Sequence, residues 1–258
     1  MKKFLFLIVF SILIISCSSE KSNLPNLNSF SLNPTDQFPV SIDETVYQTQ
    51  PARGQGHNNP HLGIHVLYAD ENKKWTKLYD NSIPSDYPPV YAIADGKIHS
   101  VIKKKEIKTP QNYHHGYEIN LIFAKDDNNE EIFANYSIEP FIEEPVDSFY
   151  ENFILVDEGQ EVSKGDILAY FFVPPNASYE ALKGKNEATT HLHFHIGNLK
   201  RNTFISPSIF NEKIREEFSK YIGGYYGSDK SGKKYIGCFG VKIESFENPF
   251  SNQALDCS

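Results

Sequence analysis

The sequence predicts a mostly β protein, a compact antiparallel β-sheet barrel-sandwich with one C-terminal helix and a small appendage. Several short segments alternate apolar and polar residues with period two, as half-buried strands do. Tyrosine and phenylalanine, which favour strands and aromatic clusters, number 15 and 19. Segments with helical periodicity are few, and 258 residues are enough to bury one sizeable core. We therefore expect a single β-rich domain.

Residues 1–16 have the form of a signal peptide. Two lysines precede an apolar run at residues 4–15, which is too short to span a bilayer. The run ends in Ile-Ile-Ser before Cys17, a pattern that resembles a bacterial lipobox. We expect cleavage before Cys17 and lipidation of its thiol; an ordinary signal peptide and an N-terminal anchor helix are the alternatives. The protein is then exported and lipid-anchored to a bacterial membrane, on its periplasmic or cell-surface face.

The charge of the chain argues against a nucleic-acid partner. The formal net charge of −8 becomes −10 when residues 1–16, with their two lysines, are removed. Binding to phosphates needs clustered lysine and arginine. The basic run at residues 103–105 is more typical of a solvated turn. We expect no nucleic acid among the partners.

Composition divides the rest of the chain into three parts. Residues 17–40 are rich in Ser, Asn and Pro without any period, which predicts a lipidated flexible tether. Residues 41–208 form the expected domain, and residues 209–258 a C-terminal helix and a β-appendage. Once Cys17 carries lipid, Cys238 and Cys257 remain as an even pair in an exported chain, so we predict a disulfide between them.

Local signals place the elements between these limits. An Asp-Gly dipeptide between apolar runs predicts a hairpin over residues 89–102. Strands are expected at 117–123 and 131–137, with His114 and His115 in a loop before them, and paired glycines predict a tight turn unit at 158–169. A helix is expected from Ser206 as its N-cap to Ile222, with proline in its first turn.

The alternating segment at residues 191–196 carries the strongest functional signal. From His191 to Ile196 every other residue is histidine, so a strand there places His191, His193 and His195 on one face. The apolar residues between them take the other face and pack into the core. Three imidazoles on one rigid strand indicate a metal site, with a solvent-exposed histidine-rich face as the alternative.

Two further histidines stand near the start of the domain. His61 and His65 enclose Gly63 in a His-x-Gly-x-His motif. In a straight strand residues four apart lie about 13 Å from each other, whereas zinc–nitrogen distances are about 2.0–2.1 Å. Both can bind one ion only if the segment bends, and glycine permits a bend.

The order of these motifs over about residues 50–208 resembles the lysostaphin/LytM-type zinc endopeptidases. The motifs are His-x-Gly-x-His, the Asp-Gly hairpin, the strand with Asn135, the Gly-Gln-x-Val-x-x-Gly turn and His-Leu-His-Phe. The resemblance implies a LytM-like fold for residues 41–208 and one zinc ion held by His61, His65 and His193, with His191 catalytic. It also implies hydrolysis of peptide bonds in peptidoglycan, a substrate that suits a lipid-anchored exported protein.

Three positions depart from the family pattern. His65 stands where the family has an aspartate ligand, Asn135 where it has a second catalytic histidine, and His195 where it has a glutamate outside the ligand set. Three histidines are an accepted catalytic zinc set with an open position for water, and one fewer negative charge makes the zinc a stronger Lewis acid. Asn135 has no proton to exchange, but its amide can donate to an oxyanion, and His191 remains as general base.

Two other functions compete with an active peptidase. The departures favour a catalytically degenerate LytM-like module that binds peptidoglycan or regulates another cell-wall hydrolase. The Gly-Gln turn is also found in barrel-sandwich carrier or adaptor modules. However, no biotinyl- or lipoyl-type lysine context accompanies the turn here, and a carrier leaves both histidine clusters unexplained.

Overall fold

The computed structural model describes nine stretches of the chain. They are residues 23–41, 45–49, 62–66, 83–108, 113–140, 148–172, 191–198, 203–205 and 209–219. Cys17, Cys238 and Cys257 lie outside these stretches, as does His61. No helix within these nine stretches is long and apolar enough to cross a bilayer.

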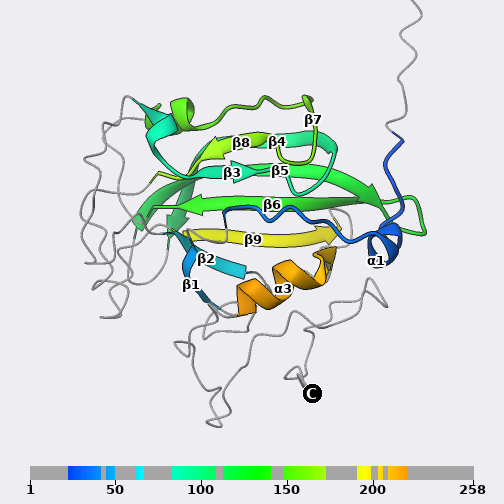
Figure 1. The fold of residues 1–258 in the computed structure, drawn as a ribbon. Coiled ribbons are helices and arrows are strands. Elements are labelled where there is room, and N and C mark those ends of the chain that lie inside the picture. The colour runs from blue at the N-terminus through cyan, green and yellow to red at the C-terminus, as the bar shows by residue number, and fades with distance from the viewer. Residues whose placement is uncertain are drawn as a thin grey trace, which may run out of the picture.

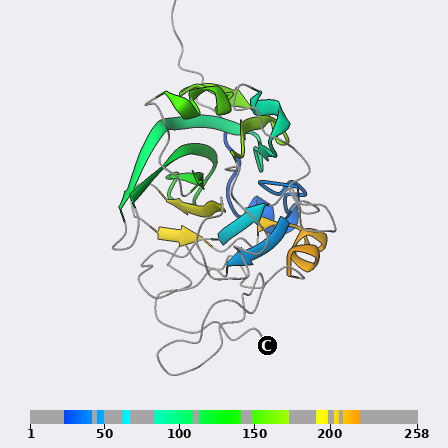
Figure 2. The ribbon, with the colours of Figure 1, turned by 90° about the vertical axis from the view of Figure 1, so that its left-hand side faces the viewer.

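The described strands form one large antiparallel sheet and one small one. The large sheet has eight strands in the order β1-β2-β9-β6-β5-β4-β7, with β10 paired to β9, and it curls into a half barrel (Figures 1 and 2). Its strands are β1 (Thr45–Thr49), β2 (Leu62–Val66), β4 (Gly96–Lys108), β5 (Tyr113–Lys125), β6 (Glu131–Glu139), β7 (Glu161–Val162), β9 (His191–Asn198) and β10 (Thr203–Ile205). The small sheet pairs β3 (Pro89–Tyr91) with β8 (Ile167–Tyr170). The predicted mostly β, antiparallel class is confirmed.

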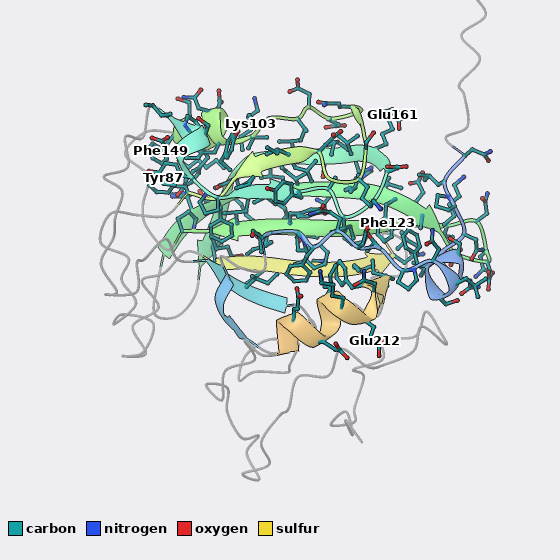
Figure 3. All side chains as sticks on the ribbon, in the orientation of Figure 1. Tyr87, Lys103, Phe123, Phe149, Glu161 and Glu212 are labelled. Carbon is teal, nitrogen blue, oxygen red and sulfur yellow. The ribbon has the colours of Figure 1, made fainter. Side chains whose placement is uncertain are left out.

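Helical structure in the described residues is sparse. It consists of α1 (Ser29–Leu32), α3 (Glu212–Ser219) and two 3₁₀ turns at Pro84–Asp86 and Phe149–Phe153. An aromatic cluster gathers around the second turn, where the ring centroids of Phe149 and Phe172 are 5.0 Å apart and those of Tyr87 and Phe172 are 5.3 Å apart. Figure 3 shows Tyr87 and Phe149 together at one end of the molecule, with Phe123 toward the other.

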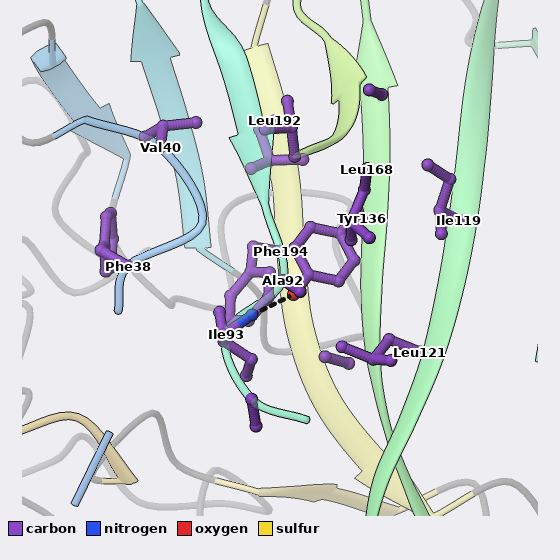
Figure 4. Packing of buried hydrophobic residues seen from close by; sticks show 14 of the residues in the cluster. Phe38, Val40, Ala92, Ile93, Ile119, Leu121, Tyr136, Leu168, Leu192 and Phe194 are labelled. Atoms are coloured by element: carbon purple, nitrogen blue, oxygen red, sulfur yellow. Dashed lines mark hydrogen bonds between the residues drawn. The ribbon is translucent and has the colours of Figure 1, made fainter. Parts of the chain in front are cut away.

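The strand carrying the histidines has the predicted alternation. Leu192, Phe194 and Ile196 are almost completely buried in the core. Phe194 packs edge-on against Tyr136, at a centroid distance of 5.2 Å. The Tyr136 hydroxyl accepts a hydrogen bond of 3.1 Å from the backbone N–H of Ile93, which joins the large sheet to the chain after β3 (Figure 4). Burial raises the pKa of Tyr136 above its ordinary value.

The flexible tether predicted for residues 17–40 is wrong from residue 23 onward. Leu27, Phe30, Phe38 and Val40 are buried in the same core as the sheet. Backbone N–H groups of this segment also pair with the sheet; the N–H of Leu27, for example, donates to a carbonyl of β5 at 2.7 Å. The few apolar side chains, spaced among Ser, Asn and Pro, bury enough surface to fix the segment.

The C-terminal helix begins later than predicted. The backbone N–H of Thr35 donates to the carbonyl of Ile209 at 2.8 Å, and its own carbonyl accepts from the N–H of Asn211 at 2.9 Å, so Phe210 lies in a β-bridge with Thr35 and α3 starts only at Glu212. Asn211 caps α3, because its side-chain oxygen accepts from the N–H of Ile214 at 2.8 Å. Ile209, Phe210 and Ile214 are buried in the common core, so the boundary expected at residue 208 divides one packed unit.

The predicted hairpin over residues 89–102 is also wrong in its pairing. β3 pairs with β8 and β4 with β5, and the backbone N–H of Ala92 donates to the backbone carbonyl of Asp166 at 2.9 Å. Glycine is required at position 96 by the close approach of β5 rather than by a turn, because a Cβ there would lie 2.2 Å from the carbonyl oxygen of Ile122. The tight unit predicted at 158–169 is confirmed: Gly159 and Gly165 have φ of +85° and +90°.

Candidate functional site

β9 lies between β2 and β6, and the two ladders decide which residues accompany the histidines. Directly paired residues of antiparallel strands belong to the same face of a sheet. From β6, Glu139 pairs with His191, Ser137 with His193 and Asn135 with His195. The histidine face of β9 is therefore continued on β6 by a carboxylate, a hydroxyl and an amide.

The ladder on the other side concerns the His-x-Gly-x-His motif. His65 pairs directly with His191, and Gly63 with His193. The register of β2 on β9 is unbroken from Leu62 to His65, so the strand does not bend at Gly63. The bend that a shared ion requires would have to lie before Leu62, outside the described stretches. Because Gly63 is the midpoint of the motif, His193 stands opposite its centre.

The side chain of His193 contacts a buried carboxylate, that of Glu139. Its Nδ1 lies 3.4 Å from Oε1 of Glu139, and the two side chains are 22% and 6% exposed. The hydroxyl of Ser137 donates to the same Oε1 at 3.0 Å. The ring of His193 is thus partly exposed to solvent, while its Nδ1 edge contacts Glu139.

A chain of polar side chains extends from Glu139 across β6, β5 and β4. The ammonium group of Lys105 donates to the Ser137 hydroxyl at 2.8 Å and is paired with Glu118. The amide of Asn120 donates to Glu118 at 3.1 Å. In their ionised forms, Lys105, Glu118 and Glu139 carry one net negative charge, which favours a cation beside His193.

Asn135 lies on the same face but has a structural partner. It is 4% exposed, and its amide nitrogen donates to the side-chain oxygen of Asn120 at 2.8 Å. The residue paired with it is His195, whose ring packs edge-on against Phe133 at 5.6 Å. His115, expected in a loop, lies in β5 and is buried.

The expected zinc ligands are described to different extents. His193 has a described side chain, His65 has a described position in the ladder, and His61 lies outside the described residues. Within the nine described stretches, no group of three or more His, Cys, Asp or Glu side chains is arranged to hold a metal ion. The donor chemistry at His193 nevertheless suits zinc, because a metal-bound imidazole commonly has its second ring nitrogen beside a carboxylate.

The sequence interpretation missed Glu139, Ser137, Lys105 and Glu118. Ser137 and Glu139 continue from Asn135 at the period of two, so the alternation of this strand already contained the signal. Lys105 and Glu118 depend on the pairing of β4 with β5, which local patterns do not specify.

No protein-family model, curated protein or solved structure matches this chain. The protein is therefore described by the features of its own fold and site. It is a mostly β protein whose curled antiparallel sheet carries a histidine face in contact with one buried carboxylate, that of Glu139.

Proposed function

We propose that this protein is a LytM-like zinc endopeptidase that is attached to a bacterial membrane through Cys17 and hydrolyses peptide bonds of peptidoglycan. The observation that carries the proposal is the register of β2 on β9. It pairs His65 with His191 and sets His193 opposite the centre of the His-x-Gly-x-His motif. Two motifs that are more than a hundred residues apart in sequence thus meet on adjacent strands.

The proposed roles combine these positions with the family pattern, since His61 lies outside the described stretches. His61, His65 and His193 would hold the zinc ion, which when bound supplies a Lewis acid and lowers the pKa of a bound water. His191 serves as the general base, because directly paired residues have Cβ atoms about 4.5–5.5 Å apart and His191 is the partner of a proposed ligand. Asn135 donates one amide hydrogen to Asn120 and has a second hydrogen for an oxyanion.

The second candidate is a catalytically degenerate LytM-like module that binds peptidoglycan or regulates a separate cell-wall hydrolase. The burial of Asn135 and its hydrogen bond to Asn120 favour this candidate. Asn135, which stands where the family has its second catalytic histidine, therefore has a structural role.

Metal analysis combined with a peptidoglycan digest separates the two candidates. The protein is purified without chelator, and His193→Ala is compared with His195→Ala, the matched loss of an imidazole from the same strand face. An active peptidase contains about one zinc ion per chain, releases soluble peptides, loses both properties with His193→Ala and keeps them with His195→Ala. A module that binds peptidoglycan without releasing peptides supports the second candidate. Wild-type protein with neither zinc nor peptide release overturns the first.

A further inference from the structure

Glu139 is a buried carboxylate at the C-terminal end of β6. Its side chain is 6% exposed and reaches diagonally across the ladder, from its own partner position at His191 to the ring of His193. A carboxylate removed from water is costly unless it is hydrogen-bonded or paired. The contacts with Ser137 at 3.0 Å and with Nδ1 of His193 at 3.4 Å meet this need.

The hydrogen bonds leading to Glu139 have a fixed direction. The ammonium of Lys105 is a donor alone, so the Ser137 oxygen accepts from it at 2.8 Å. The hydroxyl hydrogen of Ser137 then points to Oε1 of Glu139. Glu118 holds Lys105 in place from the neighbouring strand. The carboxylate of Glu139 is therefore oriented independently of the histidine.

We infer that Glu139 is a positioning residue that fixes the ring of His193 with its hydrogen on Nδ1. A neutral imidazole has one donor and one acceptor nitrogen, and a carboxylate beside Nδ1 selects the form with hydrogen there. The lone pair then lies on Nε2, at the edge of the ring that does not face Glu139. Nε2 is accordingly the atom with which His193 binds zinc; this last step rests on the proposed function.

The tautomer is a property of the metal-free chain and is measured directly. Nitrogen-15 NMR of the histidine side chains, recorded at a pH above which the ring signals no longer shift, reads which ring nitrogen carries the hydrogen in the neutral form, and His193→Asn assigns the signal. Glu139→Gln keeps an oxygen acceptor at nearly the same place, whereas Glu139→Met keeps the length of the side chain without one. Asn198→Ala, which removes a buried polar group at the far end of β9, is the control.

We expect hydrogen on Nδ1 in the wild type, Glu139→Gln and Asn198→Ala. We expect a shift toward hydrogen on Nε2, the form preferred by histidine in water, in Glu139→Met. Zinc affinity, measured by competition with a chelating dye, should fall about 10–100-fold in Glu139→Met and less in Glu139→Gln. A residue with a merely structural role would change the stability of the fold without changing the tautomer.

The outcomes distinguish this inference from the proposed function. Hydrogen on Nδ1 in both the wild type and Glu139→Met, with equal zinc affinity, overturns the inference and leaves the zinc site standing. A tautomer that depends on Glu139 in a protein that binds no zinc supports the positioning role and refutes the proposed function. Hydrogen on Nε2 in the wild type refutes the inference outright.

Discussion

Replacing Leu192 with alanine tests whether the histidines and the core lie on opposite faces of β9. Leu192 is fully buried, and its ladder partners Ile64 and Ile138 are fully buried as well. The substitution removes three buried carbons at about 0.8 kcal/mol each and leaves a cavity between two strands. We expect a loss of about 3–4 kcal/mol, within the range of about 2–5 kcal/mol typical of buried leucines.

Urea unfolding followed by circular dichroism measures this loss. With a slope of about 2 kcal/mol per molar urea, the midpoint should fall by about 1.5–2 M. Leu32→Ala is the matched control, because the same atoms are removed from a side chain that is 91% exposed, and its cost should stay below about 0.5 kcal/mol. A shift of one residue in strand register would exchange the two faces. Equal midpoints for the two variants would therefore refute the assignment of Leu192 to the core and of His193 to the opposite face.

Two further predictions concern contacts that hold the sheet together. Gly96→Ala would place a Cβ 2.2 Å from the backbone oxygen of Ile122, so we expect a loss of about 1–3 kcal/mol in thermal unfolding, and an unchanged midpoint would contradict the close approach. Tyr136→Phe leaves the buried N–H of Ile93 without its acceptor, which should cost about 1–3 kcal/mol near pH 8. Because burial raises the pKa of Tyr136, the unfolded chain ionises first and stability falls as the pH rises above about 10; Tyr136→Phe should lose less stability between pH 8 and pH 11 than the wild type, and an equal loss would contradict this.

Local patterns predicted the strands and their faces, since a period of two is visible within a few residues. The alternation around Leu192 and Phe194 and the two glycines of the tight turn unit are examples. Features that depend on partners distant in sequence were mispredicted. The chain before residue 41 has a composition typical of a tether, yet Phe38 packs 5.1 Å from Phe210 between ring centroids. The same pairing of distant segments delays the start of the C-terminal helix.

The sequence predicted the histidines of the site, but not which residues of the neighbouring strands lie beside them. The sequence placed three histidines on one strand face, and the structure confirms the alternation from Leu192 onward, with Leu192, Phe194 and Ile196 buried and His193 and His195 half-buried. The register that sets His193 opposite Gly63 and beside Glu139 is a tertiary property, because either neighbouring strand could slide along β9 without changing its own pattern. The supporting chain from Lys105 through Ser137 depends on this register and on the pairing of β4 with β5.

X-ray absorption at the zinc edge, on full-length wild-type protein purified without chelator, tests the proposed zinc site. We expect about one zinc ion per chain, bound by nitrogen and oxygen alone at about 2.0–2.1 Å, with the scattering of three imidazoles and a water. We also expect His193→Ala to lose one imidazole from that shell. A chain that binds no zinc, or zinc held by sulfur at about 2.3 Å, would refute the three-histidine zinc site.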